Sequence, residues 1–220
     1  MEERLPLQEA DIRILELEGP TIVGHTCKVI RLEAPGIEYE DLLTSVAGRV
    51  QSSPELLRRL DLTGEAPAWV PDTQFGVERH LFASESSQPL DDTELVDLTG
   101  SLFAQKLDRS RPLWRIDLVD LEGGGSALIW RIHHALADGT TAMRLARQVL
   151  WKTDPAPAAR KARPTSAGDE TRRHRHLLGL FEREFSRSAE PSPFDVAVGT
   201  DRQVAFATVS LSALHDAGKK

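Results

Sequence analysis

Hydrophobic positions along this chain follow helical spacing in some stretches and strand-like alternation in others, a mixture typical of an α/β domain. Apolar residues recur every three or four positions in residues 38–50 and 140–151, so both stretches are predicted to form amphipathic helices. Residues 91–94 have the sequence of an N-terminal capping box and predict a third helix after them. Weaker patterns predict short helices over residues 7–17 and 55–60.

Stretches rich in β-branched and aromatic residues predict strands between these helices. They cover residues 21–32, 69–82 with interruptions, 114–121, 126–133 and 201–211. The runs at 114–121 and 126–133 flank a glycine-rich tetrapeptide and together predict a β-hairpin. The expected fold class is therefore α/β, with a mixed sheet flanked by helices.

Composition narrows the functional classes. The chain has 220 residues with a formal net charge of −7, which argues against a general nucleic-acid binder. Cys27 is the only cysteine, so an internal disulfide is impossible, and this usage fits a reducing cytoplasm. No stretch approaches the roughly 18 uncharged apolar residues of a membrane span. The sequence therefore predicts a soluble or peripheral protein.

The candidate chemistry lies where the hairpin meets the last of these helices. Residues 131–139 contain His133 and His134 side by side, and Asp138 follows four residues later. If the strand continues through both histidines, His134 ends its apolar face and His133 lies on the face that carries Arg131. An apolar wall favours a neutral imidazole, which a general base must be. Because the two rings would point oppositely, this arrangement disfavours a shared metal ion.

A plainer interpretation is equally compatible with this spacing. His133 and His134 would then be partly buried polar residues at a strand end, and Asp138 only the N-cap of the following helix. Gly139 permits close backbone approach or an unusual φ angle. His25 and His80, in other predicted strands, are interpreted as packed histidines.

The motif His-His-x-x-x-Asp-Gly resembles the signature of the CoA-dependent acyltransferases with the chloramphenicol-acetyltransferase-like fold. Residues 107–114, which end in Pro-Leu-Trp, resemble a segment of the bacterial wax ester synthase/diacylglycerol acyltransferases. Residues 6–11, 19–24 and 202–206 resemble further blocks of that family. The resemblance implies one half of a two-domain fold, which here stops at Lys220, before the second domain with its Asn-Asp motif.

The resemblance also implies a reaction, namely transfer of a fatty acyl group from acyl-CoA to a long-chain alcohol or diacylglycerol. His134 would be the general base, with His133 and Asp138 beside it and Asp138 mainly structural. Gly139, Pro112, Leu113 and Trp114 are expected to bind substrate or to position the site. Acyl-CoA is a substrate in this scheme, and neither a separate cofactor nor a metal is expected.

The same resemblance sets the expected organisation of the chain. Residues 1–151 would form the N-terminal acyltransferase domain, 152–172 a linker or disordered loop, 173–200 a helix and crossover connection, and 201–220 the first strand of the second domain. A C-terminal acyltransferase half or self-association is then the expected partner. A basic entry to the helix after residue 172 leaves contact with a membrane or lipid-droplet surface open.

Two rival functions remain at this point. One is a non-catalytic or split half-domain that needs a second chain to work as a lipid- or partner-binding module. The other is a hydrolase that uses the His-Asp pair, which the absence of a Gly-x-Ser-x-Gly nucleophile elbow disfavours.

Overall fold

The computed structural model describes residues 4–84, 86, 88–151 and 196–218. Residues 1–151 and 199–220 belong to one compact unit, and residues 152–198 to another. The expected linker over 152–172 lies outside the described residues, as does most of the helix and crossover expected over 173–200.

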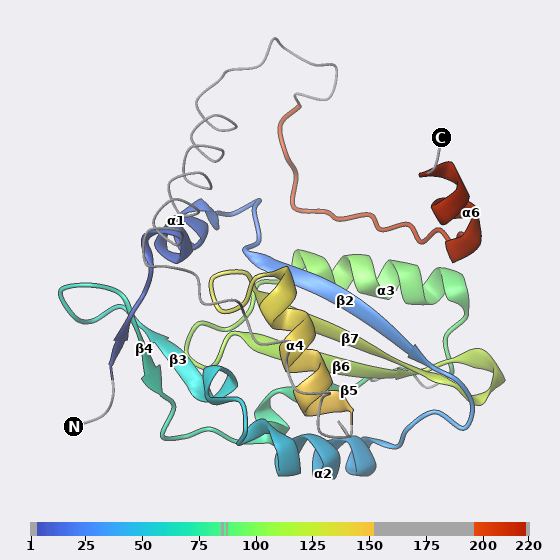
Figure 1. Ribbon diagram of the computed structural model, residues 1–220, viewed down its shortest axis with the longest axis horizontal. Helices are drawn as coiled ribbons and strands as arrows, with labels where there is room; N and C mark the ends of the chain where they lie inside the picture. The colour runs from blue at the N-terminus through green and yellow to red at the C-terminus, as the bar shows by residue number, and fades with distance from the viewer. Residues whose placement is uncertain (1–3, 85, 87, 152–195, 219–220) are drawn as a thin grey trace. The chain divides into compact units, whose positions relative to one another are not determined.

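A four-stranded mixed sheet forms the centre of the first unit (Figure 1). Its order is β2 (His25–Leu32), β7 (Ser126–His133), β6 (Trp114–Asp120) and β5 (Leu81–Ala83). The predicted hairpin is confirmed as β6–β7, and its turn uses positive φ at Gly123 and Gly124, which glycine adopts without strain. Strand β5 joins β6 in parallel, whereas the other pairs are antiparallel.

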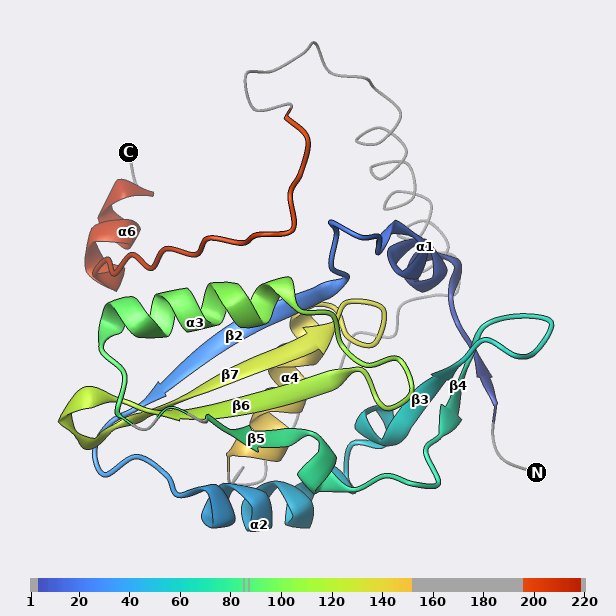
Figure 2. The ribbon, with the colours of Figure 1, turned by 180° about the vertical axis from the view of Figure 1, so that it is seen from behind.

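Helices cover both faces of this sheet. Helices α2 (Tyr39–Val50) and α4 (Gly139–Leu150) pack on the face that carries Trp130 and Ile132. Helix α3 (Asp92–Ala104) packs on the opposite face, as the view from behind shows (Figure 2). All three helices were predicted, and the capping box of α3 is present in full.

A smaller antiparallel sheet lies beside the first. Its order is β1 (Leu5–Pro6), β4 (Ala68–Pro71) and β3 (Arg58–Asp61), and it packs with α1 (Glu9–Leu17) around a second apolar cluster. The short helix predicted over 55–60 is wrong: only Pro54–Leu57 forms a 3-10 turn, and the chain then enters β3. Pairing of β3 with β4 overrides the local helical preference, because it satisfies the backbone and buries Leu60.

Short 3-10 turns and one terminal helix complete the described elements. The turns are Val77–Arg79 and Glu122–Gly124, and helix α6 covers Leu211–Ala217. The strand predicted over 201–211 is not formed: residues 201–210 have no ladder partner among the described residues, and Leu211 begins α6. An extended segment becomes a strand only when a neighbour pairs with it. Among the helices that the structure describes, none has the length and apolarity to cross a membrane.

One buried charge cluster lies within the main sheet. Asp117 on β6 accepts from Arg131 on β7 at 3.0 Å and from Arg115 at 2.6 Å. The Arg131 side chain is 1% exposed, and it also donates to the carbonyl of Leu102 in α3 at 2.7 Å. Arg131 also donates to the carbonyl of Gln105, the C-cap of α3, so this cluster ties the sheet to α3 and its C-terminal end.

Candidate active site

The two neighbouring histidines have opposite environments. Strand β7 ends at His133, which is buried, and the chain then turns so that the His134 side chain is exposed. The expected alternation of faces holds as far as His133, which lies on the α3 face with Arg131. It fails at His134, because the strand does not continue through it. The apolar wall expected beside His134 is therefore absent, and His133 is the ring that lies in dry surroundings.

Both ring nitrogens of His133 have defined neighbours. Nδ1 accepts the backbone N–H of Ala135 at 3.1 Å, so in the neutral ring the proton lies on Nε2. Nε2 faces the Glu18 carboxylate, 3.9 Å from Oε1. Burial lowers the pKa of His133 to about 4, although the negative charge of Glu18 opposes that shift. His133 is therefore neutral near pH 7, and its accepting nitrogen is already occupied.

Glu18 is the C-cap residue of α1, and its side chain is 3% exposed. Its Oε2 accepts from Nε and Nη2 of Arg109 at 3.1 and 2.7 Å, and its Oε1 accepts from the backbone N–H of Gly24 at 3.2 Å. Burial by itself raises the pKa of Glu18, but the hydrogen bonds from Arg109 and Gly24 and the positive charge of Arg109 outweigh it, so the net shift is downward. Glu18 is therefore a carboxylate next to the histidine pair.

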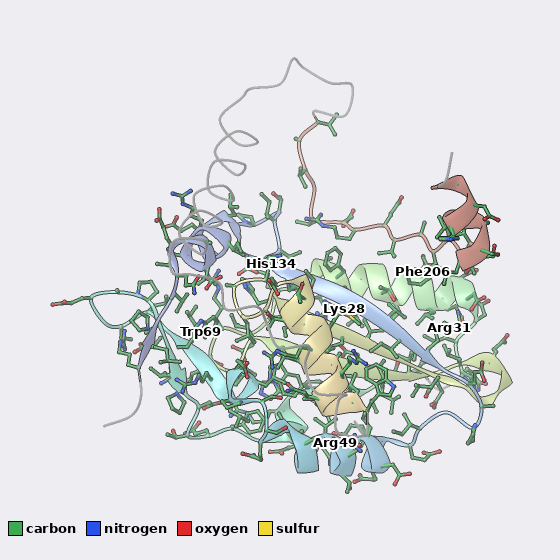
Figure 3. All side chains as sticks on the ribbon, in the orientation of Figure 1. Lys28, Arg31, Arg49, Trp69, His134 and Phe206 are labelled. Carbon is green, nitrogen blue, oxygen red and sulfur yellow. The ribbon has the colours of Figure 1, made fainter. Side chains whose placement is uncertain are left out.

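His134 is held by its backbone and surrounded by acidic groups. Its N–H donates to the carbonyl of Gly24 at 2.8 Å. Two carboxyls lie close enough to interact with His134 electrostatically, Asp11 on α1, whose pKa is raised by burial, and Asp138 at the N-cap of α4, whose pKa is lowered by its hydrogen bond with Thr141. Figure 3 shows His134 at the end of the main sheet, next to the start of α4. The site thus presents an accessible imidazole with carboxylates nearby.

Asp138 caps the helix that follows. Its Oδ1 accepts the backbone N–H of Thr141 at 2.7 Å, and this hydrogen bond is the largest cause of its lowered pKa. Among the described residues no arginine pairs with it. Gly139 is the first residue of α4 and has no positive φ, and an added Cβ would meet nothing within 4 Å. The close approach or unusual φ expected at Gly139 is therefore not found.

The Pro-Leu-Trp segment is buried and holds His133 through its backbone. Pro112, Leu113 and Trp114 are all buried, and the Leu113 carbonyl accepts the His133 N–H at 2.9 Å. The Trp114 indole donates to the carbonyl of Leu56 at 2.8 Å and stacks on His80 with 4.4 Å between ring centroids. In this structure the three residues pack and position the strand.

Three participants in this geometry were missed by the sequence patterns. Glu18, Gly24 and Asp11 come from the N-terminal segment, in which Asp11 and Gly24 fall within blocks that resemble the family but no residue was predicted to belong to the site. Arg109 lies within residues 107–114, which resemble a family segment, but no role was predicted for it. His25 is packed, as predicted, but it lies directly opposite His133 in the β2–β7 ladder, and burial lowers its pKa to about 4.

A family model and two curated relatives all indicate the same protein family for this chain. Residues 7–187 match the model of the wax ester synthase/diacylglycerol acyltransferase catalytic domain. The probable diacylglycerol O-acyltransferase tgs3 of Mycobacterium tuberculosis is 32% identical over 159 residues, which are 69% of this chain and 58% of that protein. A putative diacylglycerol O-acyltransferase of Mycobacterium bovis is 34% identical over 155 residues, which are 66% of this chain and 30% of that protein.

Solved structures agree with this result. The wax ester synthase/diacylglycerol acyltransferase of Marinobacter aquaeolei is similar with a TM-score of 0.54 and 27% identity, over 64% of this chain and 37% of that one. The X-domain from teicoplanin biosynthesis has a TM-score of 0.58 at 18% identity, over 89% of this chain and 46% of that one, and shows the fold alone. The predicted fold class, half of a chloramphenicol-acetyltransferase-like fold, is confirmed. This chain spans about a third to three fifths of the relatives it matches.

Proposed function

We propose that this chain, which belongs to the wax ester synthase/diacylglycerol acyltransferase family, supplies the catalytic histidine for acyl transfer from acyl-CoA to a lipid alcohol. The acceptors we propose are a long-chain alcohol or diacylglycerol, as the names of the relatives suggest. The observation that carries the proposal is the exposed imidazole of His134, held at the junction of β7 and α4.

His134 acts as the general base in this proposal. As the acceptor hydroxyl oxygen attacks the thioester carbon, the imidazole takes the hydroxyl proton. The tetrahedral intermediate then collapses, the carbon–sulfur bond breaks, and the proton passes to the CoA sulfur. The products are an ester and free CoA, and no acyl group becomes bound to the protein.

His133 is a poorer candidate for the base because of its contacts. Its Nδ1 already accepts the Ala135 N–H, and its Nε2 carries the proton and lies against buried atoms. A base must reach the substrate proton within hydrogen-bond distance, which the exposed ring of His134 permits. We propose that His133 and Asp138 shape the turn that presents His134.

We propose that the acyl-CoA and the acceptor are enclosed by this chain together with a second acyltransferase half. The support is the exposure of His134 on this chain and the greater length of the matched relatives. Closure over His134 would exclude water, which would otherwise compete with the lipid hydroxyl. Light scattering on the full chain, alone and mixed with the C-terminal half of a relative, measures whether a complex forms.

The experiment is transfer of radiolabelled acyl-CoA to hexadecanol and to diacylglycerol, with and without that second polypeptide. His134→Ala should lower the rate by about 10²–10⁴-fold, the usual contribution of a general base, while the melting temperature stays unchanged because the side chain is exposed. His215→Ala, on the exposed face of α6, is the matched control and should keep full activity. Undiminished transfer by His134→Ala would overturn the assignment.

A further inference from the structure

The loop between α1 and β2 touches both histidines of the site. Gly24 lies at its end: its N–H donates to Glu18, and its carbonyl accepts the His134 N–H. A Cβ built on Gly24 would overlap Nε2 of His133, so the ring of His133 packs directly on the backbone of Gly24. Any displacement of this loop would therefore shift the ring of His133 and the backbone of His134.

The Glu18 carboxylate fixes this loop from inside. It is 3% exposed, bonds Gly24 through Oε1, and faces His133 Nε2 with the same oxygen. Arg109 holds the other oxygen with two N–H groups and also donates to the Leu15 carbonyl at the end of α1 at 3.0 Å. A guanidinium that donates twice to one carboxylate and once to the adjoining helix fixes the orientation of that carboxylate.

We propose that Glu18 and Arg109 are positioning residues, which together set the ring of His133 and the backbone of His134 for acyl transfer. Arg109 orients Glu18, Glu18 orients Gly24 and His133, and Gly24 holds the His134 N–H. Neither residue touches the reacting atoms. The catalytic part of this inference rests on the proposed function, whereas the positioning itself is a property of the folded chain.

Electrostatics agree with the contacts around His133 and neighbouring His25. Burial is the first cause of the lowered pKa values of these two rings, and the negative charge of Glu18 opposes the shift at both.

Arg109 is 37% exposed, so one side of the ion pair stays in contact with solvent. Removing Arg109 leaves the buried Glu18 carboxylate without its cation, so Arg109→Gln is expected to lower stability as well as to disturb the geometry of the histidines.

The first test measures positioning without any activity assay. The full chain is labelled with ¹⁵N-histidine, which gives only seven residues to resolve, assigned by single His→Gln variants. In the wild type, His133 should be the Nε2–H tautomer at pH 7, and the His134 amide should exchange slowly with deuterium. In Glu18→Gln the His134 amide should exchange about tenfold or more faster. The reason is that the hydrogen bond from the Gly24 N–H to residue 18 loses its charged acceptor, and Gly24 in turn holds the His134 N–H.

Three further variants separate positioning from general destabilisation. Arg109→Gln should accelerate exchange of the His134 amide as Glu18→Gln does. Arg109→Lys should do so less, because the lysine keeps the charge but loses the two N–H groups that both donate to Oε2 of Glu18. Glu9→Gln is the matched control, since Glu9 forms an exposed ion pair with Arg13 on the same helix. It should leave both histidines unchanged.

The second test is acyl transfer with the second polypeptide present. Glu18→Gln should lower kcat by about 10–100-fold with little change in KM for acyl-CoA, because small misplacement of a catalytic group costs that much. The positioning would be overturned if the His134 amide exchanged at the wild-type rate in both Glu18→Gln and Arg109→Gln. It would also be overturned if Glu9→Gln accelerated this exchange as much as those two variants do. Altered exchange with an unchanged kcat would overturn its catalytic consequence. If the wild type transfers no acyl group at all, the proposed function fails while the exchange result still decides the positioning.

Discussion

Two buried carboxylates of this protein face arginines, yet they do different things. Asp117 lies inside the main sheet, and its partner Arg131 is 1% exposed and bound to β6 and α3. Glu18 lies in a loop, and its partner Arg109 is 37% exposed and comes from the loop before β6. The first pair joins layers of the core. The second joins two loops around the histidines, so similar chemistry supports stability in one region and site geometry in the other.

The largest expected effect is the loss of the carboxylate in the sheet. Asp117→Asn should lower the free energy of unfolding by about 3–5 kcal/mol, because it leaves the Arg131 charge buried without a counter-charge. Urea unfolding measures this loss. Adding Arg131→Met should recover part of it, since the buried charge is then gone. A loss below about 1 kcal/mol would mean that Arg131 finds other partners, and the contrast with Glu18 would disappear.

The second effect is a loss of unfolding free energy in acid, to which two histidines near Glu18 contribute. His25 and His133 have pKa values lowered to about 4, against about 6.5 in an unfolded chain. Between these values the unfolded chain binds protons that the folded chain does not. Their contribution is therefore fully present above pH 6.5 and is lost as the pH falls toward 4, by at most about 1.4 kcal/mol per pH unit for each ring.

Chemical unfolding between pH 7 and pH 5 tests this. His80, packed on Trp114, has a pKa lowered to about 4 as well, so three rings contribute. His25→Phe should reduce the change of unfolding free energy with pH by the contribution of one histidine. His215→Phe, at an exposed position, should leave that change as it is in the wild type. Equal slopes in the wild type and His25→Phe would show that His25 binds protons in the folded protein as it does in the unfolded chain.

The third effect compares the two carboxylates directly. Glu18→Gln should cost only about 1–1.5 kcal/mol of unfolding free energy, because the half-exposed Arg109 turns to water and the amide still accepts a hydrogen bond. The measurement is the same urea series used for Asp117→Asn. A Glu18→Gln loss as large as that of Asp117→Asn would make Glu18 a structural residue like its counterpart in the sheet.

The smallest effect concerns a third carboxylate, Asp138, which is exposed. Asp138→Ala should cost about 1 kcal/mol, as loss of a helix N-cap does, and Asp138→Ser should restore most of it. Thermal unfolding measures the stability, and the transfer assay follows the same variants. If serine restores stability but leaves transfer low, the charge of Asp138 matters to the reaction and its role exceeds that of a cap.

Local patterns predicted the elements well and the site only in part. The β6–β7 hairpin, α2, α3 and α4 follow from periodicity, a glycine turn and a capping box, all of which act between near neighbours. Residues 55–60 were mispredicted because β4, the next strand along the chain, pairs with part of them. The face of His134 was mispredicted because alternation says nothing about where a strand ends.

Glu18 and Arg109 illustrate a second limit. Each is an ordinary charged residue beside ordinary neighbours, and what makes them a pair is tertiary contact between separate loops. Burial of Glu18, which gives it influence over His133, is also a property of the whole fold. Sequence spacing identified the two histidines because they are adjacent. It did not predict the contacts with Glu18 and Arg109 that surround them.

The sequence separation between paired strands indicates the order in which the region around His133 assembles. The β6–β7 hairpin closes over a short turn and can form within microseconds, so His133 has its strand neighbours early. His25 and the loop carrying Glu18 reach His133 only when β2 pairs with β7, a contact between residues far apart in the sequence, which is slow because so much chain must be ordered first. A nascent or partly unfolded chain therefore displays the histidine motif with its acidic partner still far away. The histidine site is therefore complete only after β2 has paired with β7.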